Sequence, residues 1–227
     1  MSESYSETVK EYGRSAGAGV VGIAASKDFG LAPDGFKPAD VLEGCVSVIV
    51  LGSPFPQEAL TMEPPEYTAL RNDKLTEMTD IAKKVAKRIK ADGYLSKAIS
   101  ASGGITIEVG GRKELFGHIS LKHAAEIAGL GVISKNYLLT SPQYGNLLWL
   151  SAVLTDAPLT PDGKLQSSMC EGCNICVDAC PVGALGDTSS FGKAGCSQHF
   201  KIKDRKLLIE CYKCRAVCPH RFGIIGE

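Results

Sequence analysis

The sequence predicts a mixed α+β protein in two parts, an α/β core followed by a small cysteine-rich domain. Helical and strand-like patterns alternate through the first three-quarters of the 227 residues. Cysteines then dominate the end of the chain, where eight of the nine lie between Cys170 and Cys218. Turn residues near Asp162 to Ser168 separate these patterns, so we expect domains at residues 1–163 and 164–227.

The first half of the core predicts a helix, two strands and a long helix. A short helix is expected at Ser4 to Ala16 and a strand at Val20 to Ala24. Cys45 to Leu51 is apolar, β-branched and preceded by glycine, which is typical of a buried strand, and Cys45 is expected to pack in the core. Pro64-Pro65 suit the first turn of the long helix, and Asp92-Gly93 suit its end.

The second half predicts three strands and a helix. The strands are expected at Tyr94 to Ala101, Ile105 to Val109 and Leu147 to Leu154, and the helix at His118 to Ala128. Trp149, in the last strand, is expected to pack in the core.

Composition excludes several classes of protein. The 25 basic and 25 acidic side chains cancel, which argues against a disordered charged tail and against a non-specific nucleic-acid binder. Met1 to Arg14 is polar, and the apolar run at Val46 to Leu51 is too short to span a bilayer. We therefore expect a soluble, cytoplasmic protein without a membrane partner.

The first cysteine run has the spacing of bacterial ferredoxins. Cys170, Cys173, Cys176 and Cys180-Pro181 match C-x2-C-x2-C-x3-C-P at every position. In this pattern three cysteines hold one [4Fe–4S] cluster, and the fourth reaches across to a second cluster.

The second run, Cys211, Cys214 and Cys218-Pro219, lacks one cysteine. A regular motif would place it at position 208, which is Leu208, so Cys196 is the nearest unassigned donor. The predicted ligands are Cys170, Cys173, Cys176 and Cys218 for the first cluster, and Cys180, Cys196, Cys211 and Cys214 for the second.

Zinc is the alternative metal, because paired CxxC motifs also form tetrahedral zinc sites. The two x3-C-Pro endings are not features of zinc ribbons and favour two iron–sulfur clusters. Cations among the cysteines either offset the negative charge of such clusters or form a solvated surface. They are Lys193, Lys201, Lys203, Arg205, Lys206, Lys213 and Arg215.

Ala128 to Leu139, then Tyr144-Gly145 and Leu154 to Asp156, complete a specific pattern ahead of the cysteine motifs. In this combination the chain resembles epoxyqueuosine reductases and the related reductive dehalogenases over nearly its whole length. The resemblance implies a nitroreductase-like α/β core followed by a two-cluster ferredoxin-like domain. It also implies cobalamin in the core, with cobalt reduced through the nearer cluster.

Three features depart from the family pattern. Leu115 falls where the family has its catalytic aspartate, Ser134 replaces a glycine, and the chain ends at Glu227 without the helical repeats of tRNA-acting members. We therefore do not expect tRNA as the substrate. Glu114 and His118 are ionisable and adjacent to the aspartate position, so either is a candidate proton donor. The alternatives are a solvated carboxylate before a helix and a helix-start residue.

The resemblance also suggests where a cofactor would be bound. The candidate cofactor-binding residues are Gly129, Gly131, Lys135, Tyr144 and Gly145. Helix ends, turns and surface placement account for glycines and a lysine equally well.

The expected function is that of an iron–sulfur oxidoreductase, which passes electrons through two [4Fe–4S] clusters to a corrinoid, or less favourably FMN, in the core. The alternative is an electron-transfer protein that serves a separate corrinoid protein or reductase. Both require an electron donor, and the first also requires a small-molecule substrate that the sequence does not identify.

Overall fold

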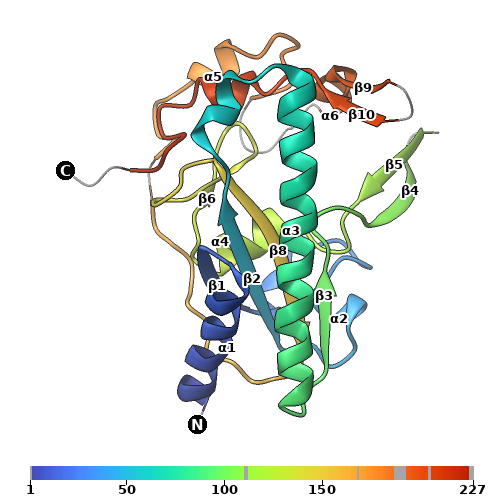
Figure 1. Ribbon diagram of the computed structural model, residues 1–227, viewed down its shortest axis with the longest axis vertical. Coiled ribbons are helices and arrows are strands. Elements are labelled where there is room, and N and C mark those ends of the chain that lie inside the picture. Colours follow the sequence, from blue (N-terminus) through green and yellow to red (C-terminus); the bar gives the residue numbers. More distant parts are fainter. Residues whose placement is uncertain (1, 110–111, 168, 187–192, 204–205, 225–227) are drawn as a thin grey trace. The chain divides into compact units, whose positions relative to one another are not determined.

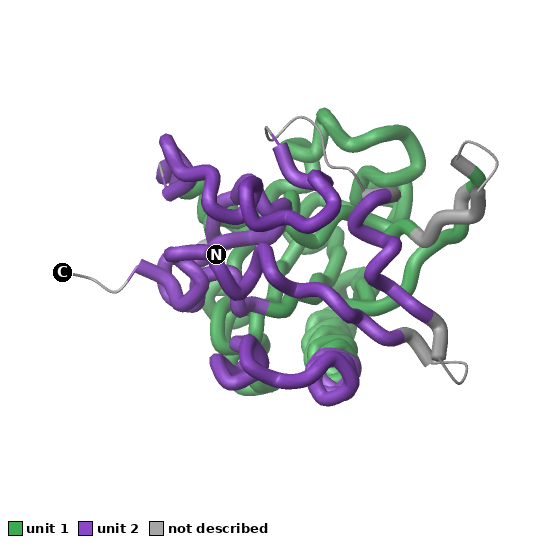
Figure 2. Tube along the Cα trace, turned by 90° about the horizontal axis from the view of Figure 1, so that it is seen from above, with its two compact units in different colours: residues 1–53, 75–130, 149–165 green, residues 54–74, 131–148, 166–227 purple. Residues whose placement is uncertain are grey.

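The computed structural model describes residues 2–109, 112–167, 169–186, 193–203 and 206–224. The chain forms two compact units, each assembled from three separate segments (Figure 2). Unit 1 comprises residues 1–53, 75–130 and 149–165, and unit 2 comprises residues 54–74, 131–148 and 166–227. The division into domains at 163/164 stays a prediction.

A four-stranded sheet lies in the first unit (Figure 1). Its order is β1 (Val20–Ala25), β2 (Ser47–Pro54), β8 (Leu148–Thr155) and β3 (Ser96–Ile99). β1 runs antiparallel to β2, and β3 runs antiparallel to β8. All residues of β2 except Pro54 are buried, which explains the unbroken apolar run of residues 48–51 at its centre.

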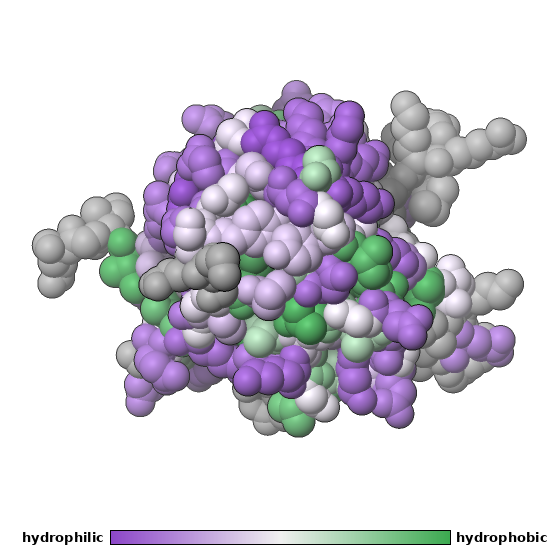
Figure 3. All heavy atoms as spheres, turned by 90° about the horizontal axis from the view of Figure 1, so that it is seen from below, coloured by the Kyte–Doolittle hydropathy of each residue, from purple (hydrophilic) through white to green (hydrophobic). Residues whose placement is uncertain are grey.

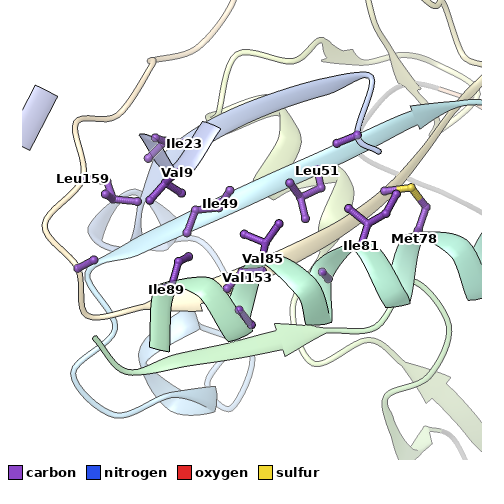
Figure 4. Close-up of a cluster of buried hydrophobic side chains, with 14 residues drawn as sticks. Val9, Ile23, Ile49, Leu51, Met78, Ile81, Val85, Ile89, Val153 and Leu159 are labelled. Atoms are coloured by element: carbon purple, nitrogen blue, oxygen red, sulfur yellow. The ribbon is translucent and has the colours of Figure 1, made fainter. Parts of the chain in front are cut away.

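Two helices supply much of the core of unit 1. They are α1 (Ser2–Ala16) and α3 (Pro64–Ala91). Met78, Ile81, Val85 and Ile89 follow helical spacing along α3 and pack against strand side chains such as Ile49 and Val153 (Figure 4). Val9 of α1 belongs to the same buried cluster, and Trp149 packs against it. The predicted long helix and core role of Trp149 are confirmed.

The remaining elements are short. In chain order they are η1 (Ser26–Phe29), α2 (Pro38–Val41), η2 (Gln57–Thr61), β4 (Ile105–Val109), β5 (Arg112–Phe116), α4 (Leu121–Ile127), β6 (Val132–Ile133) and β7 (Leu139–Thr140). The cysteine-rich segment adds α5 (Ile175–Asp178), α6 (Lys193–Cys196), η3 (Ser197–His199), β9 (Phe200–Lys203), β10 (Lys206–Ile209) and α7 (Lys213–Ala216).

Several predicted boundaries were wrong. The helix expected from His118 begins at Leu121, because Ser120 still has extended backbone angles. The strand expected from Cys45 begins at Ser47, because the Cys45 N–H donates to the Leu42 carbonyl in a turn. The strand expected over Tyr94 to Ala101 is reduced to β3. Cys45 is nevertheless buried, as expected.

Of the helices in the described residues, none combines the length and the apolar character that a membrane span requires. On the face drawn in Figure 3, hydrophilic side chains predominate and hydrophobic ones occur in small groups.

Candidate metal centre

Four of the cysteines line one pocket in unit 2. They are Cys170, Cys173, Cys176 and Cys218, the predicted ligands of the first cluster, and the pocket that they line is small and partly open to solvent. Ser134 and Asn136 complete part of the wall. Ser134, which stands where the family has glycine, is therefore a pocket residue, and its Oγ lies 2.6 Å from Thr140 Oγ1.

Short-range hydrogen bonds shape the first cysteine loop. The Cys173 N–H donates to the Cys170 carbonyl at 3.3 Å, and Gly172 between them has φ +69°. α5 then carries Cys176, and the Cys180 N–H donates to the Val177 carbonyl at 3.1 Å. The close spacing of the motif thus brings three sulfurs to one pocket and carries Cys180 beyond it.

The other four cysteines form a second group. Burial raises the pKa of the Cys196 thiol, and the nearby Cys211 and Cys180 raise it further. Burial likewise raises the pKa of Cys214 to about 11, where the charge of Arg215 opposes the rise and Cys196, Cys211 and Cys176 add to it. Electrostatic coupling of this kind requires the thiols to lie near one another. Cys196, identified from the missing cysteine at position 208, is therefore close to the other three.

These raised pKa values bear on metal binding. Iron binds the thiolate, so a thiol that is protonated near neutral pH must release its proton as the metal enters. Burial also raises the pKa of Cys176 and Cys218 in the first group. In the described part of the chain, no three His, Cys, Asp or Glu side chains form a group suited to one metal ion. The two thiolate-rich quartets fit the donor set of polynuclear iron–sulfur clusters.

Residues far from the cysteines in sequence hold the cysteine loops in place. The Lys135 ammonium donates to the Cys173 carbonyl and to Asn174 Oδ1, both at 2.8 Å. The Asn136 amide donates to the Cys214 carbonyl at 3.3 Å. Lys135 thus stabilises the first cysteine loop, and its predicted contact with a cofactor anion stays a prediction.

Asn146 and Arg215 form a reciprocal contact that the cysteine motifs do not reveal. The Asn146 amide donates to the Arg215 carbonyl at 3.2 Å, and the Arg215 guanidinium donates to the Asn146 carbonyl. Burial raises the pKa of Cys218, and a hydrogen bond from the Asn146 side chain opposes that rise. The only sequence signal for Asn146 is its position directly after Tyr144-Gly145.

Close backbone packing accounts for the predicted glycines. Gly145 has φ +57°, and a Cβ there would collide with the backbone of His220 and Arg221, just after Cys218. Gly129 has φ +72°, and a Cβ would collide with the Gly163 carbonyl. Gly131 and Tyr144 lie in unit 2 with Gly145, and a cofactor role for these residues stays a prediction.

Glu114 and His118 belong to unit 1, whereas the eight predicted cysteine ligands belong to unit 2. Glu114 lies in β5, paired with Ile107 of β4, and this strand precedes α4. His118 lies between β5 and α4 and does not start the helix. The catalytic role of either residue stays a prediction.

Known proteins are similar to this chain in sequence. The family described as "4Fe-4S binding domain" matches residues 165–186. The epoxyqueuosine reductase of Bacillus subtilis (strain 168) is 33% identical over an alignment of 118 residues, and the match covers 47% of this chain and 30% of that protein. The enzyme of Lactococcus garvieae (strain Lg2) is 25% identical over 204 residues, 83% of this chain and 55% of that protein. The chain is similar to epoxyqueuosine reductases.

Solved structures extend the similarity along the chain. An epoxyqueuosine reductase crystallised with a tRNA stem loop has a TM-score of 0.65 at 20% identity, and the match covers 96% of this chain and 65% of that chain. A variant of a catabolic reductive dehalogenase has a TM-score of 0.72 at 19% identity, covering 97% and 32%. The predicted resemblance and the mixed α/β fold are confirmed. The match spans only about a third to a half of the length of these curated relatives.

Proposed function

We propose that the chain is an iron–sulfur oxidoreductase that carries two [4Fe–4S] clusters and passes electrons through them to a corrinoid. The observation that carries this proposal is the pocket lined by Cys170, Cys173, Cys176 and Cys218 in unit 2. The electrostatic coupling of Cys196 to the three remaining cysteines of that unit supports a second site. Thiolate quartets are the ligand set of [4Fe–4S] clusters, which carry one electron at a time. The 4Fe–4S domain match over residues 165–186 supports the metal.

Cys196 provides the sharpest test of the ligand assignment. Two clusters predict about eight irons per chain after anaerobic purification. Cys196→Ala should lose or convert one cluster, whereas Cys45→Ala should retain both, because Cys45 is buried in unit 1. Iron and acid-labile sulfide analysis measures both variants. An unchanged iron content in Cys196→Ala would refute the assignment.

The corrinoid part of the proposal is supported by the relatives. One solved reductive dehalogenase was used to suggest a mechanism for B12-dependent dehalogenation. We expect the cluster-loaded chain to retain cob(II)alamin through gel filtration and to change its visible spectrum. Retention of FMN instead would replace the corrinoid by a flavin, and retention of neither would favour an electron-transfer protein that serves a separate reductase.

The substrate requires a separate experiment. Since one similar reductase was crystallised with a tRNA stem loop, the same stem loop is the competing ligand to be tested against small organohalides. We propose that the substrate partner is a small molecule or a corrinoid protein. Reduction of the stem loop by the protein, or a shift of the stem loop in a gel on binding the protein, would contradict this proposal. Cytoplasmic localisation stays a prediction.

A further inference from the structure

One cation among the cysteines is buried. Arg215 is 8% exposed, although it follows Cys214 directly in a segment rich in basic residues. Lys213, two positions earlier, is exposed, and Lys201 has a side chain that is 62% exposed and pairs with Glu210. The sequence left two explanations for these cations, a solvated surface and compensation of the negative charge of the clusters, and burial distinguishes between them. Solvation accounts for Lys213 and Lys201 but not for Arg215.

Neighbouring residues hold the Arg215 guanidinium in one place. It donates to the Asn146 carbonyl, and its side chain is hydrogen-bonded to Tyr67. The Tyr67 ring is buried and stacks on Tyr212, with ring centroids 4.1 Å apart and planes at 12°. The Arg215 N–H also donates to the Tyr212 carbonyl at 3.0 Å. A buried guanidinium with these contacts has a fixed position relative to the second cysteine loop.

The charge of Arg215 acts on the second group of cysteines. Arg215 directly follows Cys214 on α7 (Lys213–Ala216), so its buried charge lies on the same short helix as a predicted ligand of the second cluster and interacts with the Cys214 sulfur. A guanidinium remains protonated in proteins, so this positive charge is permanent. Burial matters because solvent and salt screen buried charges much less than exposed ones. Moving a charge out of water is costly unless an opposite charge is near, and a thiolate-bound cluster supplies one.

We propose that Arg215 raises the reduction potential of the cluster held by Cys180, Cys196, Cys211 and Cys214 relative to that of the other cluster. The inference rests on the proposed function, since it requires both clusters. Each cluster takes one electron from a low-potential one-electron donor and becomes more negative by one charge, with no bond formed or broken. A fixed cation nearby favours the reduced form, because net charge near a cluster sets its potential. The first electron therefore resides on the cluster beside Arg215, and Arg215 is a positioning residue, not a catalytic one.

The experiment is an anaerobic redox titration of the full, cluster-loaded chain, followed by the electron paramagnetic resonance signals of both reduced clusters. Arg215→Gln should lower the reduced-to-oxidised ratio of the second cluster at a fixed potential about tenfold, which is about 59 mV for a one-electron couple. The reduced-to-oxidised ratio of the first cluster should change less. Lys213→Gln, in the same segment but exposed, is the matched control and should change the ratio by less than about twofold.

Arg215→Lys distinguishes the effect of the positive charge on the reduction potential from that of the hydrogen bonds of the guanidinium. It keeps the positive charge with fewer donors, so its second cluster should stay within about threefold of the native ratio. This variant tests whether the charge of Arg215 sets the potential of the second cluster even where Arg215→Gln fails to retain that cluster. A tenfold shift in Arg215→Lys, or equal shifts of both clusters in Arg215→Gln, would overturn the inference. A native chain with far fewer than eight irons would refute the proposed function instead, so the two failures are distinguishable.

Discussion

At the scale of single residues, Asn146 links the two cysteine groups. It is 1% exposed, donates to the Arg215 carbonyl and approaches the Cys218 sulfur. Asn146→Ala leaves the Arg215 carbonyl without this donor but retains the Asn146 backbone carbonyl that accepts from the guanidinium. We expect the free energy of unfolding to fall by about 1–3 kcal/mol, the usual cost of an unsatisfied buried group. Chemical denaturation of the iron-loaded protein measures it.

Asn174 offers the matched control for this substitution. Its Oδ1 accepts from Lys135 at an exposed site, and Lys135 retains the Cys173 carbonyl as a second acceptor. Asn174→Ala should therefore change the free energy of unfolding by no more than about 0.5 kcal/mol. Equal changes in the free energy of unfolding for the two substitutions would show that the buried contact of Asn146 contributes no more to stability than the exposed contact of Asn174. Loss of the first cluster's native potential in Asn146→Ala would agree with its contact to Cys218, since hydrogen bonds to the sulfurs tune such clusters.

At the scale of elements, the sequence predicted what local patterns determine. β2 contains the continuous apolar run of residues 48–51 and is buried along nearly its whole length, and α3 begins at Pro64, so both were foreseeable. β5, with the sequence Arg-Lys-Glu-Leu-Phe, carries charges and depends on pairing with β4, which no local pattern reveals. The hairpin of β9 and β10 was missed for the same reason. It pairs Leu208 with Lys201, so the position where a regular motif has cysteine belongs to a strand.

In the candidate site too, local patterns could be predicted from the sequence and contacts between remote segments could not. Motif spacing predicted the grouping of Cys170, Cys173 and Cys176 with Cys218, which line one pocket, whereas the grouping of the other four cysteines as ligands stays a prediction. The burial of Arg215 was not foreseeable, because its partners Tyr67 and Asn146 come from remote segments of the chain. A contact between α3 and β10 illustrates the same dependence. The Ile209 N–H donates to Thr68 Oγ1 at 3.0 Å, and both residues are buried. Contacts of this kind require the fold before they can be recognised.

At the scale of the whole molecule, the two units should respond differently to loss of iron. The buried cluster that includes Val9, Ile49, Met78 and Val153 lies entirely within unit 1, which contains Cys45 but no predicted ligand. Unit 2 contains all eight predicted ligands, whose burial raises the pKa of several thiols. Because metal binding contributes directly to the folding free energy of small metal domains, unit 2 should lose stability when iron is removed.

Hydrogen exchange measures this difference unit by unit. After anaerobic chelation of iron, amides of α5 and α7 should exchange at least tenfold faster, whereas amides of α1 and β2 should keep their protection. Cys45→Ala serves as the control that alters unit 1 without touching a predicted ligand. Equal loss of protection in α1 and α7 would mean that the apolar core of unit 1 does not fold independently of the metal. Selective loss would show that the sheet unit is stabilised by hydrophobic burial and the cysteine unit by its clusters.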